Sequence, residues 1–247
     1  MPTLYDDPDL YDLLQPVSAA QLNYYLGLAR LHAGAVLELA CGSGQLTVPL
    51  VSAGTPATGL DQSSQMLVAA RRRAAASGTR VEFVAGDMRE FDLGRTFSLI
   101  FVARNSLLHL SEQEEFAAFF SSVRRHLKPD GVLAFDIFNP HLRFLSDTSG
   151  ERSHVMRVTS PLHGEVTVEA TNDYDRHSQV NRATWFISTA GKRDAWVVPL
   201  HLRSIFPQEL LTLLAANGVD LVRRDGDFAG GPFTSASPIQ VCQCRLA

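Results

Sequence analysis

The 247-residue chain contains no run of roughly 18 consecutive apolar residues, the length that a helix needs to cross a bilayer. Its first seven residues, Met1 to Asp7, are acidic where a secretory signal peptide is basic. Cysteine is scarce, and two of the three cysteines, Cys242 and Cys244, alternate in a strand-like segment and are expected to share one face. The pattern favours a cytoplasmic protein with no membrane partner, no disulfide framework and no bound metal.

Positive charge is also limited, with 22 Lys and Arg against 26 Asp and Glu, which gives a net charge of −4. The densest basic run, Arg71-Arg72-Arg73, is predicted to lie on the solvated side of a helix. Nucleic acid is therefore not an expected partner. With 45% hydrophobic residues, the chain can bury a full core as one domain over residues 1–247.

One short stretch is the most informative part of the chain. The apolar run Val36–Leu39 is followed by Ala40-Cys41-Gly42-Ser43-Gly44, after which a helical pattern begins. This order predicts a strand, a tight loop and a helix N-terminus, where glycines let a ligand approach unpaired backbone N–H groups. A Gly-x-Gly loop is also common in ordinary strand-to-helix turns, so by itself it leaves both readings open.

Two acidic residues each stand directly after a later predicted strand, at the same position relative to the end of the strand. The run Ala57–Leu60 ends in Asp61, at the spacing where nucleotide-binding sheets place an acceptor for ribose hydroxyls. A further run, Val81–Gly86, ends in Asp87. The loop has no third glycine in the Gly-x-Gly-x-x-Gly pattern, which argues against a nicotinamide dinucleotide.

The strings ELACGSG, GLD and AGDM, with HLKPDGVLAFDIFNP further along, resemble the class I S-adenosylmethionine-dependent methyltransferases. The resemblance implies an α/β, Rossmann-like fold, with a seven-stranded, mostly parallel sheet and helices on both faces. It implies S-adenosyl-L-methionine as cofactor, S-adenosyl-L-homocysteine as product, and N- or O-methylation of a small-molecule acceptor. The cofactor contacts that it implies are Glu38, Ala40, Gly42, Ser43, Gly44, Asp61, Gln62, Met66, Gly86, Asp87, Met88, Ala103 and Asn105.

The middle of the chain predicts the rest of this sheet. Phe97–Val102 is typical of a central parallel strand, and the polar stretch after it, residues 103–110, is expected at the reaction site. Ser111 to Glu114 has capping-box spacing ahead of a helix, and residues 132–138 predict a fifth strand. The last two strands, residues 219–224 and 239–246, are predicted to form an antiparallel hairpin at the edge.

From about residue 150 to 205, alternating runs replace the helix expected in a plain Rossmann sequence, and they predict an inserted antiparallel sheet. The insertion resembles that of sugar-amine and glycine N-methyltransferases, where it roofs the substrate pocket. The resemblance therefore implies acceptor contacts from Asn105, His201 and Arg203. Helical signals at about residues 1–33 predict a cap on the larger sheet.

Two residues are candidates for a catalytic role. His109 follows the fourth strand, and an imidazole there could take a proton near neutral pH. Tyr11 could lend a hydroxyl to the cofactor or the acceptor, as N-terminal helices do in the family. Packing roles remain open for both. Two other functions also remain open, a catalytically silent cofactor-binding protein and a nicotinamide-dependent oxidoreductase, and the resemblance allows a homodimer.

Overall fold

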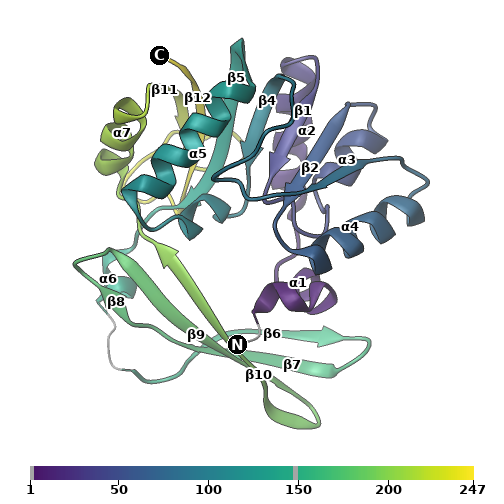
Figure 1. The fold of residues 1–247 in the computed structure, drawn as a ribbon. Coiled ribbons are helices and arrows are strands. Elements are labelled where there is room, and N and C mark those ends of the chain that lie inside the picture. The colour runs from purple at the N-terminus through teal and green to yellow at the C-terminus, as the bar shows by residue number, and fades with distance from the viewer. Residues whose placement is uncertain (1–2, 147–149) are drawn as a thin grey trace.

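The chain folds around two β-sheets in the computed structural model, which describes residues 3–146 and 150–247. The larger sheet has seven strands in the order β11-β12-β5-β4-β1-β2-β3. The smaller has five, four of them in the order β10-β9-β7-β6, with β8 paired to β9. In Figure 1 the larger sheet and its helices form an upper body, and the smaller sheet lies below it.

The larger sheet is parallel except for one strand. Its strands are β1 (Val36–Leu39), β2 (Ala57–Asp61), β3 (Glu82–Ala85), β4 (Phe97–Val102), β5 (Leu127–Phe138), β11 (Val219–Asp225) and β12 (Ile239–Leu246). Only β12 runs against its neighbours, β5 and β11. Because β1 to β4 all end at the same edge, the loops that follow them meet there.

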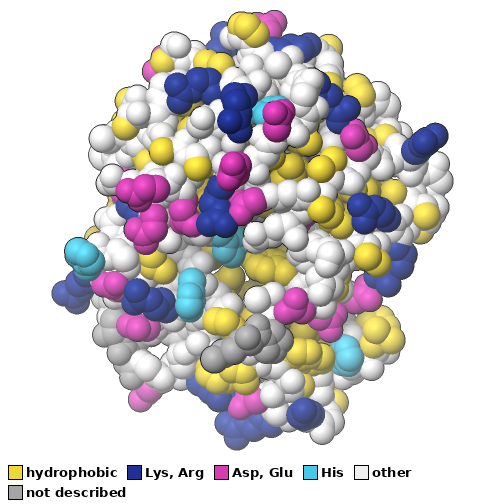
Figure 2. Space-filling model, viewed as in Figure 1, with side chains coloured by type: hydrophobic (Ala, Val, Ile, Leu, Met, Phe, Trp, Pro, Cys, Tyr) yellow, Lys and Arg dark blue, Asp and Glu magenta, His cyan; other side chains and the backbone are white. Residues whose placement is uncertain are grey.

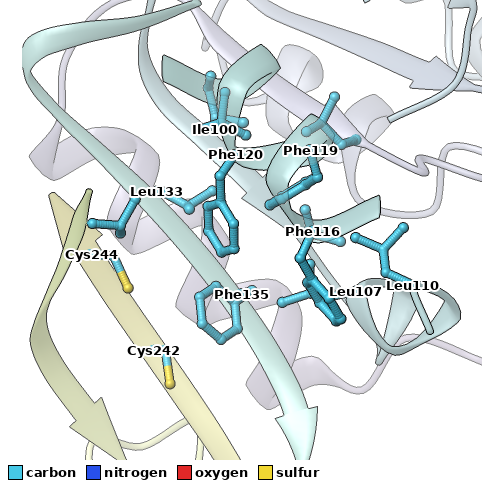
Figure 3. Packing of buried hydrophobic residues seen from close by; sticks show 14 of the residues in the cluster. Ile100, Leu107, Leu110, Phe116, Phe119, Phe120, Leu133, Phe135, Cys242 and Cys244 are labelled. Carbon is cyan, nitrogen blue, oxygen red and sulfur yellow. The ribbon is translucent and has the colours of Figure 1, made fainter. Parts of the chain in front are cut away.

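Helices cover both faces of this sheet (Figure 1). On one face lie α5 (Gln113–His126) and α7 (Pro207–Ala216); on the other lie α2 (Ala19–Leu31), α3 (Thr47–Ser52) and α4 (Ser64–Ala76). Figure 3 shows Phe116, Phe119 and Phe120 of α5 packed toward β5 and β12. Cys242 and Cys244 are fully buried in the same cluster, so the two thiols share one face as predicted.

The smaller sheet is inserted between β5 and α7. After the short helix α6 (Leu142–Leu145), it comprises β6 (Ser153–Ser160), β7 (Gly164–Thr171), β8 (Tyr174–Asp175), β9 (Val180–Thr189) and β10 (Lys192–Arg203). Val166 and Val168 alternate with polar residues and are fully buried. They pack with Leu4, Leu10 and Leu14, which come from the 3₁₀ helix η1 (Leu4–Asp6) and from α1 (Pro8–Leu14). We call residues 3–15 the N-terminal segment.

The predicted fold class is confirmed, with differences at element ends. The helix after the glycine loop begins at Thr47, two residues later than predicted. The capping box of α5 is formed by Glu112 and Glu115, one position after the predicted pair. Glu115 Oε2 accepts from the backbone N–H of both Ser111 (2.8 Å) and Glu112 (3.1 Å), which moves the helix start to Gln113. Among the described residues, no helix is both long and apolar enough to cross a bilayer.

Gly44 generates a stability prediction. Its φ is +75°, and an added Cβ would lie 3.2 Å from both Ala70 Cβ and Phe83 Cζ. Gly54 has a φ of +88° with open space around a Cβ, so it isolates the backbone cost. We expect Gly54→Ala to lose about 1–2 kcal/mol of unfolding free energy and Gly44→Ala to lose clearly more, measured by denaturant titration. Equal losses would mean that packing around Gly44 is unimportant.

Candidate functional site

A glycine loop, residues 40–46, leaves the carboxyl end of β1 and is tied to β2. Ala40, Gly42 and Gly44 all have positive φ, of 55°, 54° and 75°. The Gly42 N–H donates to Asp61 Oδ2 (2.7 Å), and the Ser63 N–H donates to Asp61 Oδ1 (2.8 Å). Burial raises the pKa of Asp61, and the backbone donors oppose that rise. The result is a fixed carboxylate at the strand ends.

A central cavity of about 300 Å³ lies beside this carboxylate. Its walls come from residues 60–63 after β2, residues 86–89 after β3 and the 3₁₀ helix η2 (Ser106–His109) after β4. Tyr5 and Tyr11 of the N-terminal segment close the remaining side. Figure 2 shows the surface hollowed between the upper body and the smaller sheet. The cavity therefore stands where open α/β sheets bind ligands.

An ion-pair cluster forms the far wall of the central cavity. Arg89 donates to both oxygens of Asp87 and, through Nη1, to Glu115 Oε1 (2.6 Å). The hydrogen bonds from Arg89 hold the pKa of Asp87 below its usual range. Arg89 thus links the loop after β3 to α5 and keeps Asp87 ionised.

A small cavity of about 20 Å³ opens on the other side of the glycine loop. Its lining includes the buried carboxyl group of Glu38, to which the Thr47 hydroxyl donates a hydrogen bond. Burial raises the pKa of Glu38 to about 8, although Thr47 and the charge of Arg104 work in the opposite direction. Glu38 is therefore largely protonated at neutral pH in the protein without ligand.

The N-terminal segment is fastened to the glycine loop by Asp12 of α1. Asp12 Oδ1 accepts from Ser43 Oγ (2.5 Å) and Gln45 Nε2 (2.7 Å), and Oδ2 pairs with Arg73. Arg73 Nε also donates to the Ser43 carbonyl (2.9 Å). The arginine run lies on the solvated side of α4 as predicted, with Arg71 and Arg72 exposed, and Arg72 in addition pairs with Asp9. Two of its three members hold α1 in place.

Tyr5 and His109 form a wall between the central cavity and an outer cavity of about 480 Å³. The Tyr5 hydroxyl and His109 Nε2 lie 2.7 Å apart and share a hydrogen bond. Desolvation lowers the pKa of His109 and raises the pKa of Tyr5, so both are neutral at pH 7. Beyond this wall, the outer cavity is bounded by β9 and β10, with Arg182 and His201 in its lining.

The residues expected from the sequence divide among these cavities. Those in the central cavity are Ala40, Gly42, Asp61, Gln62, Gly86, Asp87, Met88, Tyr11 and His109. The small cavity is lined by Glu38, Ser43 and Ala103, among others. The outer cavity is lined by His201 and Arg203, and His109 borders it as well. Gly44, Met66 and Asn105 are in none of the three linings. The Asn105 side-chain oxygen instead accepts from the Phe138 N–H (2.7 Å) and fixes the loop after β4.

Sequence reasoning missed Tyr5, Asp12, Arg89 and Arg104. Tyr5 is the tyrosine that contacts His109, whereas Tyr11 packs its ring against the Arg104 guanidinium, 5.1 Å from Cζ to the ring centroid. A usable signal existed for Arg104, because it stands directly after β4 in the stretch expected at the reaction site. No local pattern marks Tyr5 or Asp12, whose contacts span 104 and 31 residues.

Comparison with known proteins gives consistent findings. The family model of a methyltransferase domain matches residues 36–131. The chain is 28% identical over 241 residues to the cypemycin N-terminal methyltransferase of Streptomyces sp., covering 96% of this chain and 95% of that protein. It is 33% identical over 187 residues to a putative methyltransferase of Geobacillus sp. (strain WCH70), covering 70% and 74%. Among solved structures, the CcbJ methyltransferase from Streptomyces caelestis matches with a TM-score of 0.78 and 26% identity, over 94% of this chain and 97% of that one.

The protonation of Glu38 generates a pH prediction. A carboxyl group whose pKa is about 8 when folded and 4.5 when unfolded makes the folded state retain a proton, so stability falls as pH rises from 4.5 to 8. Glu38→Gln removes this contribution. Between pH 5 and pH 8, we expect the variant to lose less unfolding free energy than the wild type, by on the order of a few kcal/mol.

The measurement is denaturant unfolding of the ligand-free protein at several pH values. Glu114→Gln, at an exposed position of α5, is the matched control and should follow the wild type. Parallel curves for all three proteins would contradict a protonated Glu38.

Proposed function

The chain belongs to the class I S-adenosylmethionine-dependent methyltransferases, and from that premise we propose that it methylates the neutral amine of a small-molecule acceptor. The observation that carries the proposal is the wall shared by two cavities. Tyr5 and His109 face the central cavity on one side and the outer cavity on the other. A methyl donor and an acceptor that occupy the two cavities would meet there.

The central and small cavities are lined by the groups that the cofactor would need. Asp61 presents a fixed carboxylate for the ribose hydroxyls, and Asp87 with the Met88 backbone faces the place of the adenine. Gly42 has a φ of +54° and leaves the loop surface without a Cβ, so the ligand can approach the backbone. Glu38 lies at the amino-acid end. When bound, S-adenosylmethionine supplies an electrophilic methyl group on its sulfonium.

Two observations support an amine as the acceptor. The relative from Streptomyces sp. is named for methylation of the N-terminus of cypemycin, which is an amino group. In this chain, the Tyr5 and His109 pair offers a neutral acceptor for the proton that an amine must lose. His201 and Arg203 lie farther along the outer cavity, where they contact the rest of the acceptor.

Catalysis by these residues requires positioning and the removal of one proton from the amine through Tyr5 to His109. The walls of the two cavities hold the amine lone pair in line with the methyl carbon and exclude water. As the nitrogen–carbon bond would form, the bond from the methyl carbon to sulfur would break and S-adenosylhomocysteine would be left, and the positively charged amine would give its N–H proton to the Tyr5 oxygen. The Tyr5 hydroxyl passes its proton to His109 Nε2, which its lowered pKa leaves free to accept.

Asp61→Ala tests the cofactor site. Removing an acceptor for the ribose hydroxyls should weaken S-adenosylhomocysteine binding by about 1.5–3 kcal/mol, measured by calorimetry. Asp130→Ala, at an exposed position of β5 outside the linings of the three cavities, is the control and should bind normally. Because Asp61 also holds Gly42, melting curves without ligand must show that the variant is folded. Unchanged affinity in a folded Asp61→Ala would remove Asp61 from the site.

His109→Gln tests the proton transfer. We expect S-adenosylhomocysteine formation with an amine found by panel screening to fall by about a hundredfold or more, while cofactor affinity stays near the wild-type value. Since burial lowers the pKa of His109, protonation of His109 should add a decline of the wild-type rate below pH 6.5 to the decline set by the amine's own protonation, and the variant should lack the His109 decline.

Two further variants complete this experiment. His32→Gln, at the end of α2 and outside the cavities, should retain full turnover. If Tyr5 and His109 act as one relay, the double variant Tyr5→Phe/His109→Gln should be no slower than His109→Gln alone. A His109→Gln variant with most of its turnover and an unchanged pH profile would leave catalysis to positioning alone.

A further inference from the structure

The small cavity is lined by one carboxyl group, Glu38, and one guanidinium, Arg104. We propose that Arg104 binds the carboxylate of the cofactor's methionyl group, opposite Glu38, which receives its ammonium. The inference rests on the methyl-transfer function proposed above and is independent of the acceptor. It assigns a ligand contact to a residue that follows β4 and lies outside the glycine loop.

The backbone of Arg104 is held in an unusual conformation. Arg104 and Asn105 both have left-handed backbone angles, with φ of 61° and 63°. Such angles are costly for residues with a Cβ and are retained where surrounding contacts enforce them, often at binding sites. Here the enforcing contact is Asp136 at the end of β5, whose side chain accepts from the Arg104 N–H (2.9 Å). This turn brings the Arg104 side chain beside the glycine loop.

The partners of the guanidinium among the described residues are neutral. Arg104 Nη2 donates to the Gln15 carbonyl, and the group stacks on the Tyr11 ring. Within the described part of the chain, no carboxylate forms an ion pair with it at contact distance. The positive charge of Arg104 nevertheless stabilises the ionised forms of two nearby carboxyl groups, since it lowers the pKa of both Glu38 and Asp136. A ligand carboxylate is a stronger acceptor than the carbonyl it would replace.

The charges of the small cavity match an amino acid. A ligand carboxylate needs a cation, which Arg104 supplies, and a ligand ammonium beside the Glu38 carboxyl group favours its ionised form, so that the occupied cavity holds one group of each sign. The other arginine near the loop, Arg73, is already paired with Asp12. A volume of about 20 Å³ is close to that of one water, so the lining must open to admit the methionyl group, and release of Arg104 from the Gln15 carbonyl would both add space and free the guanidinium for the carboxylate.

The test is calorimetric binding of two ligands, S-adenosylmethionine and its decarboxylated form, which keeps the ammonium and lacks the carboxylate. We expect Arg104→Gln to bind S-adenosylmethionine about 10- to 100-fold more weakly than the wild type. The decarboxylated ligand should bind both proteins with affinities within about threefold, since it offers nothing for Arg104 to pair with. Arg104→Lys, which keeps the charge, should recover part of the loss.

A matched control separates ligand pairing from loosening of the N-terminal segment. Arg73→Gln breaks the contact to Asp12 and lies outside the small cavity, so it should weaken both ligands to a similar degree. Equal losses of both ligands in Arg104→Gln, or no loss of either, would overturn the assignment of Arg104. Failure of the wild type to bind S-adenosylmethionine would overturn the methyl-transfer function itself and this inference with it.

Discussion

Asp136 is a buried carboxylate on which much of the site's geometry depends. Its side chain accepts from the Tyr25 hydroxyl (2.6 Å) and Gln21 Nε2 (3.2 Å) of α2, and from the Arg104 N–H. Its own carbonyl accepts from the Asn105 N–H (3.1 Å). Burial raises the pKa of Asp136, and these donors offset the cost of an ionised group inside the protein. One side chain thereby joins α2, β5 and the loop that leads to η2.

The N-terminal segment joins the two sheets in a comparable way. Its leucines pack against the smaller sheet, while Asp12 fastens it to the glycine loop of the larger one. Tyr5 and Tyr11 on the same segment then line the central cavity. The first residues of the chain therefore complete a site whose other walls come from residues 60–63, 86–89 and 106–110, far along the sequence.

What could be predicted from the sequence was local. Gly42, Asp61 and Asp87 could be expected to lie together because each follows a strand and parallel strands bring such positions to one edge, and all three line the central cavity. Contacts that depend on folding were not visible: Ser111 has capping-box spacing, but Glu115 decides where α5 begins. The Asn105 side chain could contact a ligand, but in the structure its oxygen accepts a hydrogen bond from the Phe138 N–H. The sequence does not distinguish Tyr5 from Tyr11 as the partner of His109, because only the tertiary fold brings the Tyr5 hydroxyl within 2.7 Å of His109 Nε2.

The shared N-terminal segment has a consequence for the order of events in turnover. Thr3 and Tyr5 also line the outer cavity, so displacing the segment to exchange the cofactor removes part of that cavity's wall. An occupied outer cavity gives the segment additional contacts and holds it against the glycine loop. With this shared wall, an acceptor in the outer cavity would slow cofactor exchange, and the spent cofactor would leave after the methylated product. The arrangement is that of an ordered kinetic mechanism, in which the cofactor would enter first and depart last.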